Sequence, residues 1–306
     1  MDQEKFSAKK SARRSSAKTN EGPKRSKPSA GSQKNLLKAG LYLVATPIGN
    51  LQDLSLRGVE ILQNVDVIAC EDTRVTGKML SRHAIDTAMK AYHEHNAERA
   101  RPGLLRIIKA GGAVALVSDA GTPAISDPGF RLVNECILQG LEITAAPGAN
   151  AAITGLILSG LPTDRFLFAG FLPAKSNQRT KELAGLAEVP ATLIFYESAK
   201  RLAAALADMA EQLGDRPAAV TRELTKLHEE IRRGSLSELS NHYQEAGAPK
   251  GEIVIVIGRP LKKVALTEAE LDELIHQALP DNSVRDVAAE LARETGVAKR
   301  QIYARA

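Results

Sequence analysis

Several residue types that often carry function are scarce in this chain of 306 residues. It has no Trp, five Tyr and six Phe, so stacking of aromatic side chains on bases is not an obvious mode of recognition. Its two cysteines, Cys70 and Cys136, lie far apart and fit neither a disulfide framework nor the ligand spacing of a zinc site. The simplest compartment for such a chain is a reducing cytoplasm.

Long apolar runs and the common motifs of nucleotide and metal chemistry are also missing. No run of about eighteen apolar residues could span a membrane, and no apolar segment follows the basic N-terminus as a secretory signal would need. We find no Rossmann or P-loop glycine motif, no H-E-x-x-H and no G-x-S-x-G. His93 and His95 alternate in one segment, but the sequence names no third ligand. We therefore expect a polar loop there and no metal site.

Positive charge is concentrated at the N-terminus. Residues 1–39 hold eleven Lys or Arg against three Asp or Glu, a net of +8, so the rest of a chain with net charge +5 carries −3. Residues 1–38 are rich in Ser, Lys, Arg and Gly, and we predict a disordered basic tail. Such a tail is attracted to polyanions without reading their sequence. It can be a solvated leader or an RNA-binding arm.

From residue 41 onward, short apolar runs alternate with amphipathic segments. The predicted strands are 41–45, 65–70, 114–117 and 141–145, then 166–169, 191–196, 218–221 and 253–257. The predicted helices are 55–63, 76–82, 97–109, 128–139, 149–158 and 199–213, with Asp127 and Pro128 marking the start of 128–139. This alternation indicates an α/β fold with a largely parallel, doubly covered sheet in the first half. The break at 160–162 divides the chain into α/β domains at 39–159 and 160–258.

The last part of the chain, 259–306, is predicted to be a helical appendix. Thr267 and Glu270 form a capping-box pattern, and Ser283 with Asp286 is a weaker one. A helix, a glycine at 296 and a second short helix have the outline of a helix-turn-helix. The alternative is a helical hairpin that packs on the body or on a partner chain.

Three loops follow predicted strands and could form a ligand site at one edge of the sheet, where ligands of open α/β sheets bind. The loop 46–50 contains one Pro and one Gly, a weak signal. The loop 117–129 gathers small, polar and turn-forming residues, with Asp119 placed to accept hydrogen bonds from a ligand. The loop 146–152 brings only small residues to a helix N-terminus, which suits either a flat ring or a tight contact between helix and sheet.

These loops and several others resemble the tetrapyrrole methylase superfamily. The motifs are Ala45–Leu51, Cys70–Arg74, Val117–Pro123, Ser126–Gly129, Pro147-Gly148, Gly170–Pro173, Phe195–Ser198, Arg222–Lys226 and Lys250–Glu252. Their order matches the branch that acts on ribosomal RNA, over about residues 40–303. The third loop departs from the pattern: the family has Pro-Gly-Pro followed by Ser or Cys, where this chain has Ala149 and Asn150.

The resemblance implies a two-domain homodimer that binds S-adenosylmethionine in the cleft between its domains. It also implies methylation of the ribose 2′-oxygen of a cytidine in the decoding region of 16S ribosomal RNA, the small-subunit RNA. Carried over by position, the cofactor-binding residues are Pro47, Ile48, Gly49, Asp119, Ala120, Gly121, Ser126, Pro147, Gly148, Ala149 and Asn150.

A ribose hydroxyl is a poor nucleophile, so a nearby base or polarising cation would help the reaction. Candidates in the motif loops are Glu71, Asp72, His93, Glu197 and Glu223, and we predict that Asp72 and Glu197 border the substrate side. The basic residues predicted to hold phosphates are Arg74, Lys175, Arg201 and Lys250. Glu71, Asp72 and Arg74 can equally form an ion network that stabilises the fold.

Two other functions stay open. A methyltransferase acting on a tetrapyrrole would share the fold and the cofactor, but it has no need of a basic tail or a helical appendix. A non-enzymatic RNA-binding ribosome assembly factor would not need three loops of small residues at strand ends.

Overall fold

The computed structural model describes residues 37–125, 129–260, 267–295 and 297–306. Nearly all of the predicted basic tail, 1–38, lies outside these residues. The same holds for Ser126, for the helix-start signal Asp127-Pro128 and for the predicted stop at Gly296.

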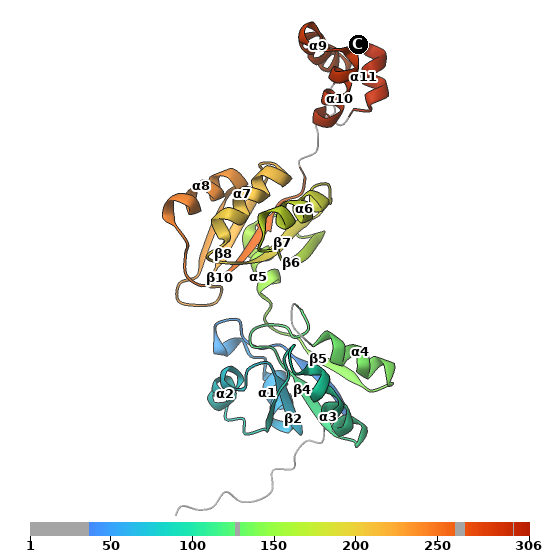
Figure 1. Ribbon diagram of the computed structural model, residues 1–306. Helices are drawn as coiled ribbons and strands as arrows, with labels where there is room; N and C mark the ends of the chain where they lie inside the picture. Colours follow the sequence, from blue (N-terminus) through green and yellow to red (C-terminus); the bar gives the residue numbers. More distant parts are fainter. Residues whose placement is uncertain (1–36, 126–128, 261–266, 296) are drawn as a thin grey trace, which may run out of the picture. The chain divides into compact units, whose positions relative to one another are not determined.

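The first half of the chain forms a five-stranded sheet in which every described pairing is parallel, as the alternation predicts (Figure 1). Its order is β3-β2-β4-β1-β5. The strands are β1 (Gly40–Val44), β2 (Val67–Cys70), β3 (Met89–Ala91), β4 (Ala113–Leu116) and β5 (Ile143–Ala146). The edge strand β3 was not predicted, because its three partly exposed residues show no apolar run.

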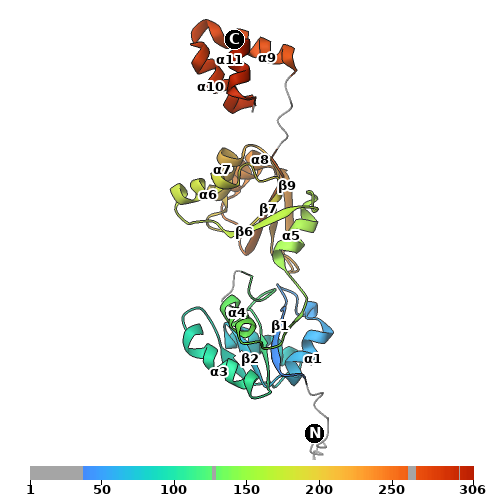
Figure 2. The same cartoon turned by 90° about the vertical axis from the view of Figure 1, so that its right-hand side faces the viewer.

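Helices cover both faces of this sheet. They are α1 (Leu56–Asn64), α2 (Thr73–Arg82), α3 (Ala97–Lys109) and α4 (Phe130–Leu138). Tyr42 and Val44 of β1 pack with α1 and α2, whereas Leu41 packs with α3 and α4, because successive strand side chains point to opposite faces. Figure 2 shows α1 on one side of the strands and α3 and α4 on the other.

The second half forms a mixed five-stranded sheet of order β6-β7-β10-β8-β9. Its strands are β6 (Phe166–Phe171), β7 (Thr192–Ser198), β8 (Pro217–Arg222), β9 (Glu230–Ser235) and β10 (Glu252–Ile257). Only β6 and β7 pair in parallel. Helices α6 (Ser176–Leu186), α7 (Leu202–Leu213) and α8 (Leu236–Ala246) pack on one face. Helix α5 (Ala151–Ser159) packs on the other, so this sheet too is covered twice.

Three elements of the second half were not predicted: α6, β9 and α8. β9 has the polar sequence Glu-Ile-Arg-Arg-Gly-Ser, and α6 has a weak apolar face. A signal for α8 was available, because Ser235 and Glu238 form a capping box at its start.

The C-terminal residues fold into a small helical group with its own core. It comprises α9 (Glu268–Ala278), α10 (Val284–Thr295) and α11 (Lys299–Arg305), packed around buried residues such as Leu271, Val287 and Ile302. The predicted capping box is present: the Thr267 side chain accepts from the Glu270 backbone, and the Glu270 carboxylate accepts from Thr267. Among the described residues, no helix has the length and apolarity needed to cross a membrane.

Close packing of α5 on the second sheet generates a stability prediction. A Cβ atom at Gly155 of α5 would lie 3.1 Å from both Thr221 Oγ1 and Val254 Cγ1, whereas a Cβ at Gly185 of α6 would meet open space. Gly155→Leu should lower the free energy of unfolding by about 1–3 kcal/mol through overpacking. The same change at Gly185 should raise it by up to about 1 kcal/mol, because Leu is the better helix former. Urea unfolding of both variants tests this, and equal stabilities would contradict it.

Candidate functional site

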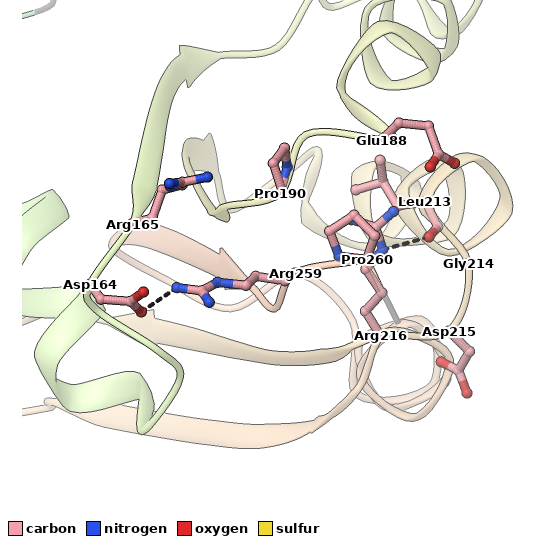
Figure 3. Close-up of a pocket in the computed structure, with 10 residues that line it drawn as sticks. All are labelled: Asp164, Arg165, Glu188, Pro190, Leu213, Gly214, Asp215, Arg216, Arg259 and Pro260. Carbon is pink, nitrogen blue, oxygen red and sulfur yellow. Dashed lines mark hydrogen bonds and ion pairs between the residues drawn. The ribbon is translucent and has the colours of Figure 1, made fainter. Parts of the chain in front are cut away.

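Two sizeable cavities lie in the described part of the chain, and the larger one is not the better candidate. This arginine cavity, of about 730 Å³, is lined by Asp164, Arg165, Glu188, Pro190, Leu213, Gly214, Asp215, Arg216, Arg259 and Pro260 (Figure 3). Arg259 forms an ion pair with Asp164. The buried Arg216 guanidinium donates to the carbonyl oxygens of Leu213, at 2.7 Å, and Ala187, at the ends of two helices. Two of its three arginines are thus already engaged within the protein.

The second cavity, about 480 Å³, gathers the predicted loops and is called the loop cavity below. It is lined by Ile48, Glu71, Asp119, Ala120, Gly121, Thr122, Ile125, Asn150, Ala151, Phe171, Tyr196, Glu197, Ser198, Leu224, Gly251, Glu252, Ile253 and Val254. One wall comes from loops that follow parallel strands of the first sheet. The other wall comes from the ends of β6 and β7 and the start of β10. This is the carboxyl-end position at which α/β sheets bind ligands.

Main-chain hydrogen bonds hold the first two loops together. Thr46 and Gly121 exchange N–H···O bonds of 2.9 and 3.1 Å and form an isolated antiparallel bridge. The buried Thr46 hydroxyl also donates to the Ser118 carbonyl at 3.0 Å, and the Ser118 hydroxyl donates to that of Gly121 at 3.0 Å. Gly121 has φ +84°, a conformation that favours glycine, so this residue type is required where the bridge forms.

Side chains join the third loop to the second. The Thr122 hydroxyl donates to the Ala149 carbonyl at 3.1 Å, and Asn150 Nδ2 donates to Thr122 Oγ1 at 3.3 Å. Asn150 Oδ1 accepts from the Ile153 backbone at 3.1 Å and so caps the N-terminus of α5. The departure from the family pattern at Asn150 thus provides both a helix cap and a link between loops.

The predicted cofactor-binding residues divide into those on the cavity wall and those behind it. Ile48, Asp119, Ala120, Gly121 and Asn150 line the loop cavity, whereas Pro47, Gly49, Pro147, Gly148 and Ala149 do not. A Cβ at Gly148 would lie 3.0 Å from Ala45 Cβ, so this glycine permits close packing of two loops. Ser126 lies outside the described residues.

Gly49 was predicted to bind the cofactor, but it packs against a turn of the second half of the chain. A Cβ there would collide with Lys226 and Thr225, and the Asn50 backbone donates to Thr225 Oγ1 at 3.1 Å. The turn holding Thr225 is strained, since Glu223 and Thr225 have φ of 51° and 65°. Lys226 Nζ holds it by donating to Glu223 and Glu252, both at 2.8 Å. This turn fixes the position of the loop 46–50.

Of the two predicted catalytic residues, Asp72 does not line the loop cavity. Its carboxylate caps α2 by accepting from the Arg74 backbone at 2.8 Å, and it pairs with the exposed Arg74 guanidinium at 2.6 Å. The hydrogen bonds from Arg74 lower the pKa of Asp72 to about 2. Because the folded pKa is depressed, the stability from this contact is present above the ordinary pKa and is lost as pH falls through about 2.

Glu197, the other predicted catalytic residue, lines the loop cavity but is almost wholly buried. Its Oε1 accepts from the Ser198 backbone at 2.6 Å and from Arg201 Nε at 2.7 Å, while the buried Oε2 has no hydrogen-bond partner among the described residues. This ion pair holds Arg201 against a residue of the cavity wall, although Arg201 does not itself line the cavity. Lys175, at the start of α6, and Lys250, before β10, have exposed side chains and do not line the cavity.

Three residues of the cavity wall were not predicted as site residues from the sequence: Thr122, Phe171 and Tyr196. The rings of Phe171 and Tyr196 meet edge to face with centroids 5.4 Å apart, and Phe171 is 57% exposed. A signal existed, because Phe171 and Tyr196 lie in motifs of the family resemblance. Their meeting depends on the pairing of β6 with β7.

The chemistry of the wall fits a cationic nucleoside that carries an amino-acid group. The carboxylate of Asp119 favours positive charge, whereas Ile48, Leu224 and Val254 offer apolar surface for a ring. Within the described ranges, no group of three or more His, Cys, Asp or Glu side chains could hold a metal ion.

Comparison with known proteins agrees with this arrangement. The family model Tetrapyrrole (Corrin/Porphyrin) Methylases matches residues 40–240, and the model RsmI C-terminal HTH domain matches residues 265–306. Curated relatives named Ribosomal RNA small subunit methyltransferase I include one from Mesorhizobium japonicum, 50% identical over 88% of this chain and 92% of the relative. Another, from Erythrobacter litoralis, is 49% identical over 88% of this chain and 95% of the relative.

Solved structures share the fold at low identity. A diphthine synthase has a TM-score of 0.56 at 15% identity and covers 71% of this chain and 89% of its own. A uroporphyrin-III C-methyltransferase from Thermus thermophilus, complexed with S-adenosylhomocysteine, has a TM-score of 0.50 at 21% identity. It covers 71% of this chain and 96% of its own.

The link through Asn150 generates a prediction about the loops. Asn150→Ala removes the cap of α5 and should lower the free energy of unfolding by about 1 kcal/mol. Asn150→Asp is the matched control, because it keeps the capping oxygen and removes only the donor to Thr122. Chemical denaturation of the two variants would contradict the capping role if they proved equally stable.

Proposed function

Because the chain belongs to the ribosomal RNA small subunit methyltransferase I family, a branch of the tetrapyrrole methylases, we propose that it transfers a methyl group from S-adenosylmethionine to 16S ribosomal RNA. The acceptor atom proposed is the ribose 2′-oxygen of a cytidine in the decoding region. The observation that carries this proposal is the loop cavity, where three linked loops at strand ends face acidic and aromatic side chains of the second sheet.

The residues on the cavity wall fit S-adenosylmethionine. Asp119 and the main chain of Ala120 and Gly121 would hold its polar groups, with Ile48 and Asn150 beside them. When bound, the cofactor supplies an electrophilic methyl group on a sulfonium. Pro47, Gly49, Pro147, Gly148 and Ala149 would support this wall by fixing the loops, and Ser126 is proposed to take part by its position in the motif.

The substrate RNA is proposed to contact basic residues near the cavity. Lys175 and Lys250 have exposed ammonium groups that can reach phosphates. Arg74 and Arg201 would act from within their ion pairs with Asp72 and Glu197. Accordingly, Asp72 and Glu197 are proposed to act on the substrate side by orienting these arginines.

We propose that the two sheets belong to domains at 39–159 and 160–258, with α5 at the end of the first segment packing on the second sheet. The appendix 259–306 follows, and we propose that the enzyme works in the cytoplasm as a homodimer. Exposed apolar side chains on α4 and α5 support an interface with a second copy; they are Phe130, Ile137, Leu138, Ile153 and Ile157. Ile153→Glu with Ile157→Glu should then yield monomers in light scattering. A double variant of unchanged mass would exclude α5 from the interface.

The experiment that tests the proposed function has two stages. Calorimetric titration with S-adenosylmethionine separates an enzyme from an RNA-binding assembly factor, which would give no heat of binding. Methyl transfer to small subunits that lack the modification, with a porphyrin as the competing acceptor, then separates RNA from tetrapyrrole chemistry. Absence of transfer to the subunits, despite cofactor binding, would overturn the proposal.

The orienting role of Asp72 and Glu197 generates a prediction of its own. Asp72→Ala and Glu197→Ala should each lower the methyl-transfer rate by up to about 100-fold through misplaced arginines. Cofactor affinity, measured by calorimetry, should stay unchanged. Glu182→Ala, an exposed change on α6, serves as the control. Full activity in both variants would remove the assignment.

A further inference from the structure

The proton released by a methylated ribose hydroxyl needs an acceptor, and four carboxylates line the loop cavity: Glu71, Asp119, Glu197 and Glu252. A useful acceptor must be reachable from the cavity, and its carboxylate must not be held by a cation or by a hydrogen bond from the protein, because such contacts stabilise the ionised form and weaken the base. These two conditions distinguish among the four.

Three of the four carboxylates are engaged. Glu197 is buried and accepts from Ser198 and Arg201. Glu252 pairs with Lys226 at 2.8 Å. Asp119 Oδ1 accepts from the Asp72 backbone at 3.1 Å, and its place on the wall assigns it to the cofactor.

Glu71 meets both conditions. Its side chain is exposed on the cavity wall, directly after β2, and its carboxylate accepts no hydrogen bond from the described part of the chain. The Asp72 backbone bond to Asp119 keeps the segment 71–72 against the loop after β4. Glu71 therefore stands beside the proposed cofactor-binding loop and remains open to a substrate.

Resting on the proposed function, we propose that the Glu71 carboxylate is the general base that accepts the proton of the ribose 2′-hydroxyl. As the hydroxyl oxygen forms its bond to the methyl carbon, the carbon–sulfur bond breaks and its electron pair stays on sulfur. The hydroxyl proton passes to a Glu71 oxygen and later to water. The products are a 2′-methoxy ribose, a neutral thioether and a proton.

The charges around Glu71 suit this role. Partial desolvation at the cavity wall raises the pKa of Glu71, the carboxylates of Asp119 and Asp72 raise it further, and His93 opposes them. A base whose pKa moves toward the working pH is a better proton acceptor. In the described part of the chain His93 forms no hydrogen bond to Glu71, and its effect on the pKa of Glu71 is coulombic.

The central test compares Glu71→Gln with the wild-type enzyme in single-turnover methyl transfer to unmodified small subunits. The rate should fall by at least about 100-fold, as expected for loss of a general base. Affinities for S-adenosylmethionine and for RNA should stay within about twofold, because the amide keeps the shape of the side chain. Glu211→Gln, an exposed change on α7, is the matched control and should keep the full rate.

A second readout does not depend on catalysis. NMR can follow the titration of glutamates that carry ¹³C-labelled carboxyl groups. The resonance that disappears in Glu71→Gln is that of Glu71, and the midpoint of its pH titration should lie above the ordinary pKa of about 4.3. His93→Gln should move that midpoint, and the acidic limb of the rate profile, to higher pH. A Glu71→Gln enzyme as fast as wild type, or a midpoint at or below the ordinary value, overturns the proposal. An inactive wild-type enzyme would instead overturn the proposed function.

Discussion

The pairing of Thr46 with Gly121 is the contact on which the candidate site depends. It joins the main chains of two loops that follow neighbouring parallel strands, and its two hydrogen bonds leave little freedom to either loop. Thr122 then connects this pair to the third loop, through Ala149 and Asn150. A wall built from main chain and small side chains is rigid and open, which is what a ligand with many polar groups requires.

The second sheet completes the cavity and also fixes the first loop. Lys226 donates hydrogen bonds to both Glu223 and Glu252. The strained turn that contains Thr225 packs against Gly49 and accepts a hydrogen bond from the Asn50 backbone. Strain of this kind persists only where surrounding contacts hold it. The acidic residues of the site therefore have two different roles. Three of them bind basic side chains and backbone amides within the protein: Asp72, Glu197 and Glu223. The carboxylate of Glu71 has no such partner among the described residues and remains available to a substrate.

Much of the fold could be predicted because strands and helices of a covered α/β sheet have strong local patterns. The parallel first sheet and the α/β character of the second half were expected, and the bounds of α3 were predicted without error. The missed elements had weak patterns: β3 is short and partly exposed, β9 is polar, and α6 has little apolar asymmetry. At the site, glycine and proline marked the loops, but they could not tell the cavity wall from its support, since close packing and ligand contact both require small residues.

By itself, the sequence determined most of the strands and helices, the three loops at strand ends and the family resemblance, because these follow from local periodicity, turn residues and motif order. Only the tertiary structure decided which side chains meet. Tyr196 reaches Phe171 through the register of β6 and β7, Gly49 meets a turn more than 170 residues away, and Asp72 is committed to its helix while Glu71 is not. These outcomes depend on distances across the folded chain, and the spacing of residues along a sequence does not contain them.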